Sequence, residues 1–211
     1  MRMGEAFWTA GSPPPERIVD IPTLASERLL VRRLRDEDLE ACHRLWLDIG
    51  YADPALAEAA NRARRAEWLS WTMTSYDQLS ELMQPPYGDR AIVSRADGRF
   101  LGVVGLVPAF GPFDQLQHTG LEEPTRFSPE VGLFWAVSPP EQGLNVASEA
   151  AGLLIAYAFE ALHLKRIVAT TERDNAASLG VMRRLDMAVY PNPYGEPPWF
   201  QMVGMLDAPV P

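Results

Sequence analysis

The alternation of apolar and polar positions is clearest between residues 130 and 185. Residues 130–137 (EVGLFWAV) and 166–171 (RIVATT) are apolar runs of strand length, bounded by turn-forming residues. A long, mostly apolar segment that begins near Val146 separates them and predicts a helix. Asn175 follows the second run and is a typical helix-capping residue, so a further helix is expected there. This stretch therefore predicts strand, helix, strand, helix, and the other segments are expected to pack around it.

The N-terminal half predicts one strand and two helices. Residues 27–34 alternate apolar and charged side chains, as a half-buried strand does. Asp36, followed by two more acidic residues, is typical of a helix N-terminus because the helix dipole favours negative charge there. Asp53 precedes a proline, which predicts the start of a second helical region that reaches Met83.

A hairpin is expected next. Residues 91–95 and 99–107 read as strands, and residues 96–98 (ADG) between them supply the glycine that a tight turn requires. Gly102 and Gly105 lie inside the second strand and lack the dinucleotide-binding pattern, so we expect close packing or a bulge there.

The remaining connections suggest a flap and an exposed sheet edge. Residues 108–129 are rich in Gly, Pro and Gln and predict a long loop, which we interpret as a flap on the substrate side. Strands are expected at residues 187–190 and 199–206, joined by the proline-rich segment 191–198. Because an unpaired edge strand invites a partner, the C-terminal strand predicts an edge at which a homodimer forms.

Length and composition predict one domain. The chain has 211 residues, 47% of them hydrophobic, which is enough for one sizeable core. Residues 1–20 contain the run Pro13-Pro14-Pro15 and carry little to bury, so they predict a tail or surface arm. Residues 21–211 are expected to form the domain.

Charge and cysteine content restrict the partners. The net charge of -9 disfavours a nucleic-acid partner and mildly favours a cationic substrate. Cys42 is the one cysteine, which rules out an internal disulfide, and no Cys/His cluster has zinc spacing, so no metal is expected. No apolar segment approaches the roughly 18 residues of a membrane span, so we expect no membrane association and a cytoplasmic protein.

The turn between the first central strand and its helix is suited to a phosphate. The strand ends at Ser138-Pro139-Pro140, and the chain turns through Gly143 into the helix. Free backbone N–H groups and the positive helix end would point at one spot outside the sheet. A single glycine is weak support, because any strand-to-helix turn can contain one.

Several motifs in order strengthen this interpretation. They are Gln142-Gly-Leu-Asn-Val-Ala-Ser-Glu-Ala150, Tyr157-Ala-Phe159, Arg166-Ile-Val-Ala169, Asp174-Asn-Ala-Ala-Ser178, and the opening Ser26-Glu-Arg-Leu-Leu-Val-Arg32 with Asp38 downstream. Together they resemble the acetyl-CoA-binding core of the GNAT N-acetyltransferase superfamily, most closely its ribosomal-protein N-acetyltransferase-like branch. The resemblance covers about residues 22–206.

The resemblance implies a fold and a reaction. The fold is a single-domain α/β (α+β) architecture with a mixed, mostly antiparallel sheet, in which one parallel strand pair splays apart between flanking helices. The reaction is N-acetylation of a primary amine, with acetyl-CoA as co-substrate, by direct attack in a ternary complex.

It also implies a role for each matched residue. Main-chain groups of the strand would pair with the pantetheine arm, and backbone N–H groups of the loop would hold the pyrophosphate. Asn175 would bond the pantetheine or hold the splayed edge, and Ser178 would protonate the departing thiolate. The cofactor-binding set is Trp135, Ala136, Val137, Gln142, Gly143, Leu144, Asn145, Val146, Ala147, Asn175 and Ser178.

Acetyl transfer from a thioester requires few catalytic side chains. A thioester is already activated, so holding a neutral amine about 3 Å from its carbonyl carbon supplies much of the acceleration. One backbone N–H, from Trp135 or Ala136, would stabilise the charge on the thioester oxygen. A carboxylate or histidine must take the proton of the amine. Glu130 is our first candidate because it lies on the strand that would hold the thioester, although a solvated carboxylate at a strand end is an equal alternative; His118 and Glu123 are the others.

Three positions depart from the family pattern. Asn145 replaces the second loop glycine, Met182 stands where many members place a tyrosine acid, and Asp186-Met187 replaces Gly-Phe. Asn and Asp tolerate positive φ best among non-glycine residues, so both turns are expected to survive at a cost of about 1 kcal/mol. The Asn145 side chain would, however, extend to where phosphate approaches, and Ser178 remains the one motif-derived acid.

The sequence does not determine which amine is the acceptor. A protein N-terminus, a small amine and an aminoglycoside are all compatible with the sequence. Asn145 and Met182 also leave room for a second class of function, a catalytically silent acyl-CoA-binding or interaction module. A donor other than acetyl-CoA is a third alternative, because the width of the splay decides which acyl chain fits.

Overall fold

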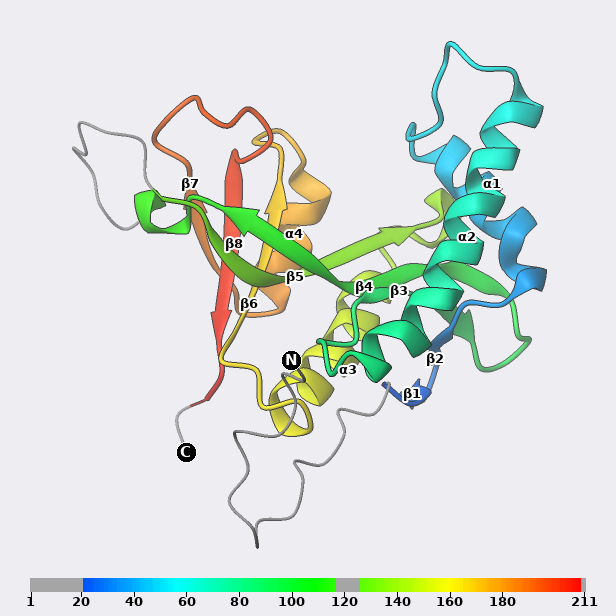
Figure 1. Ribbon diagram of the computed structural model, residues 1–211, viewed down its shortest axis with the longest axis horizontal. Helices are drawn as coiled ribbons and strands as arrows, with labels where there is room; N and C mark the ends of the chain where they lie inside the picture. The colour runs from blue at the N-terminus through cyan, green and yellow to red at the C-terminus, as the bar shows by residue number, and fades with distance from the viewer. Residues whose placement is uncertain (1–20, 117–125, 210–211) are drawn as a thin grey trace, which may run out of the picture.

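One mixed sheet organises the protein (Figure 1), and the computed structural model describes it over residues 21–116 and 126–209. The strands are β1 (Leu24–Ala25), β2 (Leu29–Arg33), β3 (Gly88–Ser94), β4 (Phe100–Gly111), β5 (Ser128–Val137), β6 (Arg166–Thr171), β7 (Ala188–Pro191) and β8 (Met202–Asp207). The helices are α1 (Leu39–Asp48), α2 (Glu58–Glu81), α3 (Val146–Glu160) and α4 (Ala176–Arg184), with 3-10 turns η1 (Asp36–Asp38), η2 (Phe113–Leu116) and η3 (Pro139–Glu141).

The sheet contains one parallel pair. Its order is β1-β2-β3-β4-β5-β6-β8-β7, and every neighbouring pair is antiparallel except β5 and β6. Those two strands are paired at a single register position, Gly132 opposite Val168, and separate beyond it. The predicted mixed, mostly antiparallel sheet with a splayed parallel pair is therefore confirmed.

Helices cover both faces of the sheet. Side chains alternate along a strand, so Val103 belongs to the core under α1 and α2, and Val104 belongs to the core under α3. Trp46 of α1 and Leu69 of α2 fill the first core, whereas Leu154 of α3 is fully buried in the second. Figure 1 shows α1 and α2 packed against each other. The two helical layers therefore contact the two sides of the same strands.

Two helix starts differ from the sequence-based prediction. The helix expected at Asp36 opens as the turn η1, and α1 begins at Leu39. The helix expected at Asp53 begins at Glu58, because the Asp53 carboxylate accepts the N–H of Ala55 at 3.0 Å and closes a local turn instead. Short polar side chains that bond their own backbone delay helix formation in this way.

The predicted loop at residues 108–129 is partly sheet. β4 continues to Gly111 and β5 begins at Ser128, so the two strands pair without interruption from Gly102 opposite Val137 to Gly111 opposite Ser128. The rings of Phe110 and Phe127 pack in a tilted arrangement, with centroids 5.4 Å apart, where the two strands diverge. Residues 117–125 of the predicted flap, and the whole predicted N-terminal arm at residues 1–20, lie outside the described residues.

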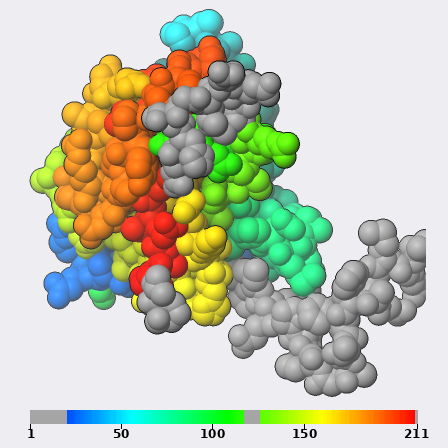
Figure 2. Space-filling view, turned by 90° about the vertical axis from the view of Figure 1, so that its left-hand side faces the viewer, coloured from blue at the N-terminus to red at the C-terminus, as the bar shows by residue number. Residues whose placement is uncertain are grey.

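The C-terminal strand is not a sheet edge. β8 lies between β6 and β7, so its backbone groups are paired on both sides and the edge proposed for a homodimer is not available on it. The edges of the sheet are β1 and β7. Figure 2 views the side of the molecule that carries β7 and β8, and the C-terminal part of the chain (orange to red) lies together on this surface.

Two glycines of β4 bring strands into close contact, as expected. A Cβ on Gly102 would lie 2.2 Å from the carbonyl oxygen of Ala136, and one on Gly105 would lie 2.6 Å from the carbonyl oxygen of Gly88. The ladder between β3 and β4 also shifts register beside Gly102, between Ile92 and Val93. Both the predicted close packing and the predicted bulge are therefore present.

We predict that Gly102→Ala destabilises the protein. Its new methyl group would collide with backbone of β5, and overpacking of this kind costs about 3 kcal/mol. Gly152→Ala is the matched control, because a Cβ there meets no atom within 4 Å and alanine is favoured in a helix by about 1 kcal/mol. Chemical denaturation should show opposite signs for the two variants. Equal stability of Gly102→Ala and the wild type would contradict the close approach.

A carboxylate is half-buried at the start of β3. The Oδ1 atom of Asp89 is closed off from solvent and has no hydrogen-bond partner among the described residues. Burial raises the pKa of Asp89 from 3.8 to about 6, although the charge of Arg65 opposes the shift. The folded protein therefore holds this proton more tightly than the unfolded chain does.

This carboxylate makes stability depend on pH. Between pH 4 and pH 6 the folded state binds more protons at Asp89, so its contribution to stability falls as the pH rises, and it levels off above pH 6. The shift corresponds to about 3 kcal/mol. We predict that Asp89→Asn is more stable than the wild type at pH 7.5 and that this difference disappears near pH 4, as measured by urea unfolding. Glu67→Gln, at an exposed carboxylate of α2, should show no such difference.

Candidate active site

A cavity of about 740 Å³ lies where β5 and β6 separate. Its size is within the range of about 300–1,000 Å³ that is usual for cofactor and substrate sites. The C-terminal ends of both strands, the turn before α3 and the first turn of α4 line most of it. Nearly all residues predicted to bind the cofactor are brought together here; Leu144 is the one that does not line the cavity.

The edge of β5 presents backbone groups to this cavity. The N–H of Ser138 donates to the carbonyl of Leu101 in β4, at 2.9 Å. Hydrogen-bonding direction alternates along an antiparallel strand, so Ala136 also turns its main-chain groups toward β4, whereas Trp135 and Val137 turn theirs toward the gap. The side chain of Gln142 donates to the Val137 carbonyl at 3.1 Å, which fits this direction. Of the two predicted oxyanion donors, the geometry therefore favours Trp135 over Ala136.

The turn before α3 has the backbone conformation that glycine would give. Gly143 has φ of 77° and Asn145 has φ of 66°, and Asp186 has φ of 57° at the end of α4. The prediction that Asn145 and Asp186 keep positive φ is thus confirmed. Asn145 is exposed and makes no capping hydrogen bond with its side chain. It occupies a conformation that L-residues other than glycine adopt at a cost.

Backbone N–H groups in this turn are available for a ligand. The N–H of Gln142 donates to the carbonyl of Pro139 at 3.2 Å. Those of Gly143 through Ala147 donate to no backbone carbonyl among the described residues. They precede or open α3, whose first N–H groups have no partner within the helix. Apart from Gln142, the predicted phosphate cradle is therefore free to bind an anion.

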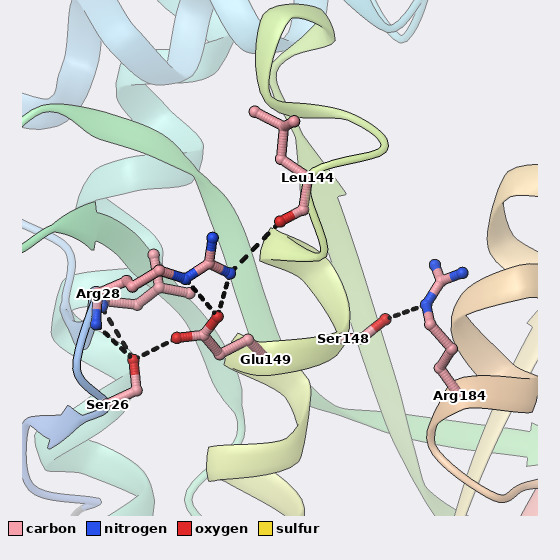
Figure 3. A network of polar contacts seen from close by, with 7 residues as sticks. Ser26, Arg28, Leu144, Ser148, Glu149 and Arg184 are labelled. Carbon is pink, nitrogen blue, oxygen red and sulfur yellow. Dashed lines mark hydrogen bonds and ion pairs between the residues drawn. The ribbon is translucent and has the colours of Figure 1, made fainter.

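An ion pair braces this turn from the N-terminal strands (Figure 3). Arg28 donates to the carboxylate of Glu149 through Nε at 3.0 Å and to the carbonyl of Leu144 through Nη2 at 3.4 Å, and Ser26 donates to the same carboxylate. Burial raises the pKa of Glu149, but the bonds from Arg28 and Ser26 outweigh it and leave that pKa below its usual value. The negative charge in the first turn of α3 is thus neutralised.

A second arginine approaches the same turn from α4. Arg184 donates from Nε to the hydroxyl of Ser148 at 2.9 Å, and both residues line the cavity. Figure 3 shows Arg184 extending from α4 toward Ser148 in the first turn of α3. The site therefore has a cation beside its free N–H groups, which the sequence motifs did not reveal.

The first turn of α4 is ordered by Asn175. Its side-chain oxygen accepts the N–H of Ser178 at 3.0 Å, so Asn175 caps the helix, and both residues line the cavity. Met182 is fully buried instead, with its sulfur 3.1 Å from the point where a Cβ on Gly204 would lie. Ser178 therefore lies at the cavity, whereas the residue at the tyrosine position belongs to the core.

Glu130 lies apart from this cavity. It lines a smaller hollow of about 210 Å³ together with Tyr87, Lys165 and Arg166. The other predicted bases, His118 and Glu123, fall outside the described residues. The structure therefore does not bring the first-ranked base to the cavity that holds Ser178.

Sequence reasoning missed the residues on the other side of the gap. Ile49 and Tyr51 after α1, Trp199 before β8, and Glu172 directly after β6 line the cavity. Val168 belongs to the core opposite α3, so alternation places Glu172 on that same face. The position of Glu172, a carboxylate at the end of the splayed strand β6, was the one feature of the sequence that indicated this side of the cavity.

Two other kinds of feature have no candidate in the part of the chain that the structure describes. Within residues 21–116 and 126–209, no group of three His, Cys, Asp or Glu side chains is arranged to hold a metal ion. No helix in those ranges is long and apolar enough to span a bilayer.

Comparisons with known proteins agree with this architecture. The chain is 38% identical over 58 residues to the uncharacterized N-acetyltransferase YnaD of Bacillus subtilis, a match that covers 28% of this chain and a third (33%) of that protein. An acetyltransferase from Agrobacterium tumefaciens has a similar fold, with a TM-score of 0.63 at 22% identity over 89% of this chain and 95% of that one. RimL, a ribosomal L7/L12 alpha-N-protein acetyltransferase solved with coenzyme A, is similar with a TM-score of 0.53 at 15% identity over 85% and 93% of the two chains.

The family assignment rests on a sequence model rather than on these distant folds. The model described as an acetyltransferase (GNAT) domain matches residues 28–188, which include every strand from β2 to β6 and all four α-helices. A match over most of the chain, on a fold that solved acetyltransferases share, shows that this protein belongs to the GNAT acetyltransferase family.

Proposed function

We propose that this protein transfers the acetyl group of acetyl-CoA to a primary amine. The observation that carries the proposal is the continuous cavity that joins a turn of free N–H groups to the gap between β5 and β6. Such a cavity offers an anion site at one end and unpaired strand backbone along its length. An acyl donor with phosphates and an amide-containing arm matches both features.

The residues present fit such a donor. The N–H groups of Gly143 through Ala147 and the positive end of α3 would hold its phosphates, and Arg184 would add a full positive charge. The carbonyl of Trp135 and the N–H of Val137 would pair with the amides of its arm, since the Val137 carbonyl already accepts from the side chain of Gln142. Asn175 uses its oxygen to cap α4, so its side-chain nitrogen remains to donate to that arm.

The catalytic roles divide among three residues. Bound acetyl-CoA supplies an activated thioester. The N–H of Trp135 would donate to the thioester oxygen as negative charge develops there. Glu172 would accept the proton of the amine, directly or through a water molecule, and the hydroxyl of Ser178 would donate to the departing sulfur.

Glu172 suits the role of base better than Glu130. Both are carboxylates beside the splayed strands, but Glu172 lines the cavity and Glu130 does not. Glu172 is exposed and forms no ion pair with any described residue; its contact is with the hydroxyl of Thr171 at 3.3 Å. Its charge is therefore available to a substrate.

We predict that Asn145 governs the affinity for acetyl-CoA. Asn145→Gly keeps the positive φ and removes the side chain from the phosphate approach, so the dissociation constant from calorimetry should fall by about threefold. Asn145→Ala should weaken binding instead, because alanine disfavours this conformation by about 1 kcal/mol. Weaker binding by Asn145→Gly would mean that the amide itself contacts the ligand. No heat with the wild type at millimolar acetyl-CoA would overturn the proposed function.

We predict that Glu172→Gln lowers kcat by at least about a hundredfold while the KM for acetyl-CoA changes little, since general bases contribute about 10²–10⁴-fold. The assay follows thiol release across a panel of amines. Asp174→Asn, at an exposed carboxylate outside the cavity, and Glu130→Gln should both remain active. Loss of activity in Glu130→Gln alone would transfer the role to that residue. Acetyl-CoA binding without release from any amine would favour a silent binding module.

A further inference from the structure

The cavity passes through the sheet from one face to the other. Val146 and Ala147 at the start of α3 line it on one side, and Ile49 and Tyr51 after α1 line it on the other. The cores under α1 and α3 lie on opposite faces of β4. A cavity lined from both sides must therefore cross between the separated strands. It has a second end, remote from the phosphate turn, at which an acceptor can enter.

Two exposed aromatic rings line this second end. The side chain of Tyr51 is 65% exposed and that of Trp199 is 50% exposed. Scattered exposed aromatic residues are common on protein surfaces. These two come from distant segments of the chain and converge on one cavity, which argues for a shared ligand.

Packing holds the tryptophan in place. The ring of Trp199 lies 3.3 Å from the point where a Cβ on Gly111 would be, so the absence of that side chain makes room for the indole. Phe200 contacts it edge to face, with centroids 5.3 Å apart. The ring is thus presented to the cavity by a fixed support.

The apolar wall continues at Phe134 of β5. Its ring lies 6.4 Å from that of Trp46, and Trp46 packs against Trp68 with centroids 5.1 Å apart. The guanidinium of Arg65 stacks on both tryptophans, at 4.0 Å and 4.6 Å from the ring centroids. This layer fixes the floor of the second end, so the shape there is set before any substrate binds.

Negative charge at the cavity is limited to one available carboxylate. Among the described residues that line the cavity, the carboxylates are Glu141 and Glu172. Glu141 is paired with Arg99. Glu172 alone is left to receive a cation, and it directly follows β6, one of the two strands that border the gap.

Resting on the proposed function, we infer that the acceptor is a primary monoamine that carries an apolar or aromatic group close to its nitrogen. The single ammonium would pair with Glu172, and the apolar group would pack against Tyr51, Trp199 and Phe134. A polyamine or an aminoglycoside has several ammonium groups, and all but one would lose water without gaining a partner. The same chemistry occurs in a free arylalkylamine and in a peptide that begins with an apolar residue.

The test compares acceptors that differ in one property. Thiol release from acetyl-CoA is measured with phenethylamine against ethanolamine, and with Phe-Gly-Gly against Gly-Gly-Gly. Spermidine and kanamycin represent polycations. We expect kcat/KM to be about tenfold or more higher for the apolar member of at least one pair, since burial of such a group is worth more than 1.4 kcal/mol. The pair with the larger ratio tells whether the source is a free amine or a peptide.

Variants assign this preference to the aromatic rings. Trp199→Ala and Tyr51→Ala should each reduce the preference by about tenfold, mainly through a higher KM for the apolar acceptor. Trp71→Ala is the matched control, because Trp71 is 66% exposed on α2 and does not line the cavity. Thermal unfolding checks that each variant is folded, and Trp199→Phe, which keeps a ring, should retain most of the preference.

The outcomes separate this inference from the proposed function. Thiol release that is faster with spermidine, with kanamycin or with the polar member of both acceptor pairs would overturn the inference and leave the acetyltransferase proposal intact. An apolar preference that survives both alanine variants would also overturn it. Absence of release with every amine would overturn the proposed function and with it the inference.

Discussion

The parting of β5 from β6 is the constraint on which the site depends. Parallel strands normally exchange hydrogen bonds along their length, yet these two share one register position, Gly132 opposite Val168. The backbone groups of β5 that face β6 have lost their strand partner beyond that point and need another. A ligand with amide groups in an extended arm can serve as that partner. The cavity is thus the direct consequence of an incomplete sheet.

Both sides of the opening are held by the rest of the fold. β5 stays fixed because β4 pairs with it along all ten residues, and the absence of side chains at Gly102 and Gly105 lets the strands beside β4 approach closely. β6 stays fixed because β8 pairs with its whole length. The gap can therefore persist without either strand moving to close it.

The sequence predicted the cofactor side of this arrangement better than the acceptor side. β6 has the predicted bounds of residues 166–171, α3 begins at the predicted Val146, and Asn145 adopts the positive φ inferred from its place in the turn. All three depend on local conformation, which short motifs encode. The predicted start of α2 was wrong because the side chain of Asp53 accepts a hydrogen bond from nearby backbone, which competes with helix formation.

The acceptor side could not be predicted in the same way. Tyr51, Trp199 and Glu172 meet because the order of strands brings the ends of α1, β6 and the β7–β8 connection to one place. No local pattern records that convergence, and Glu172 was not among the predicted bases. Glu130 was the first candidate because its strand was recognised, whereas its position along the strand relative to the gap was not.

The two ends of the cavity therefore differ in how they recognise a ligand. At the end proposed to hold phosphate, the donors would be main-chain N–H groups, which any sequence that keeps the turn at Gly143 and Asn145 will present. At the other end recognition depends on the identity of a few side chains carried by connections between elements. Connections tolerate substitution more readily than the elements they join. If the proposed function holds, one sheet opening can thus keep a constant donor while the acceptor changes, since the groups proposed to contact each ligand belong to separate parts of the chain.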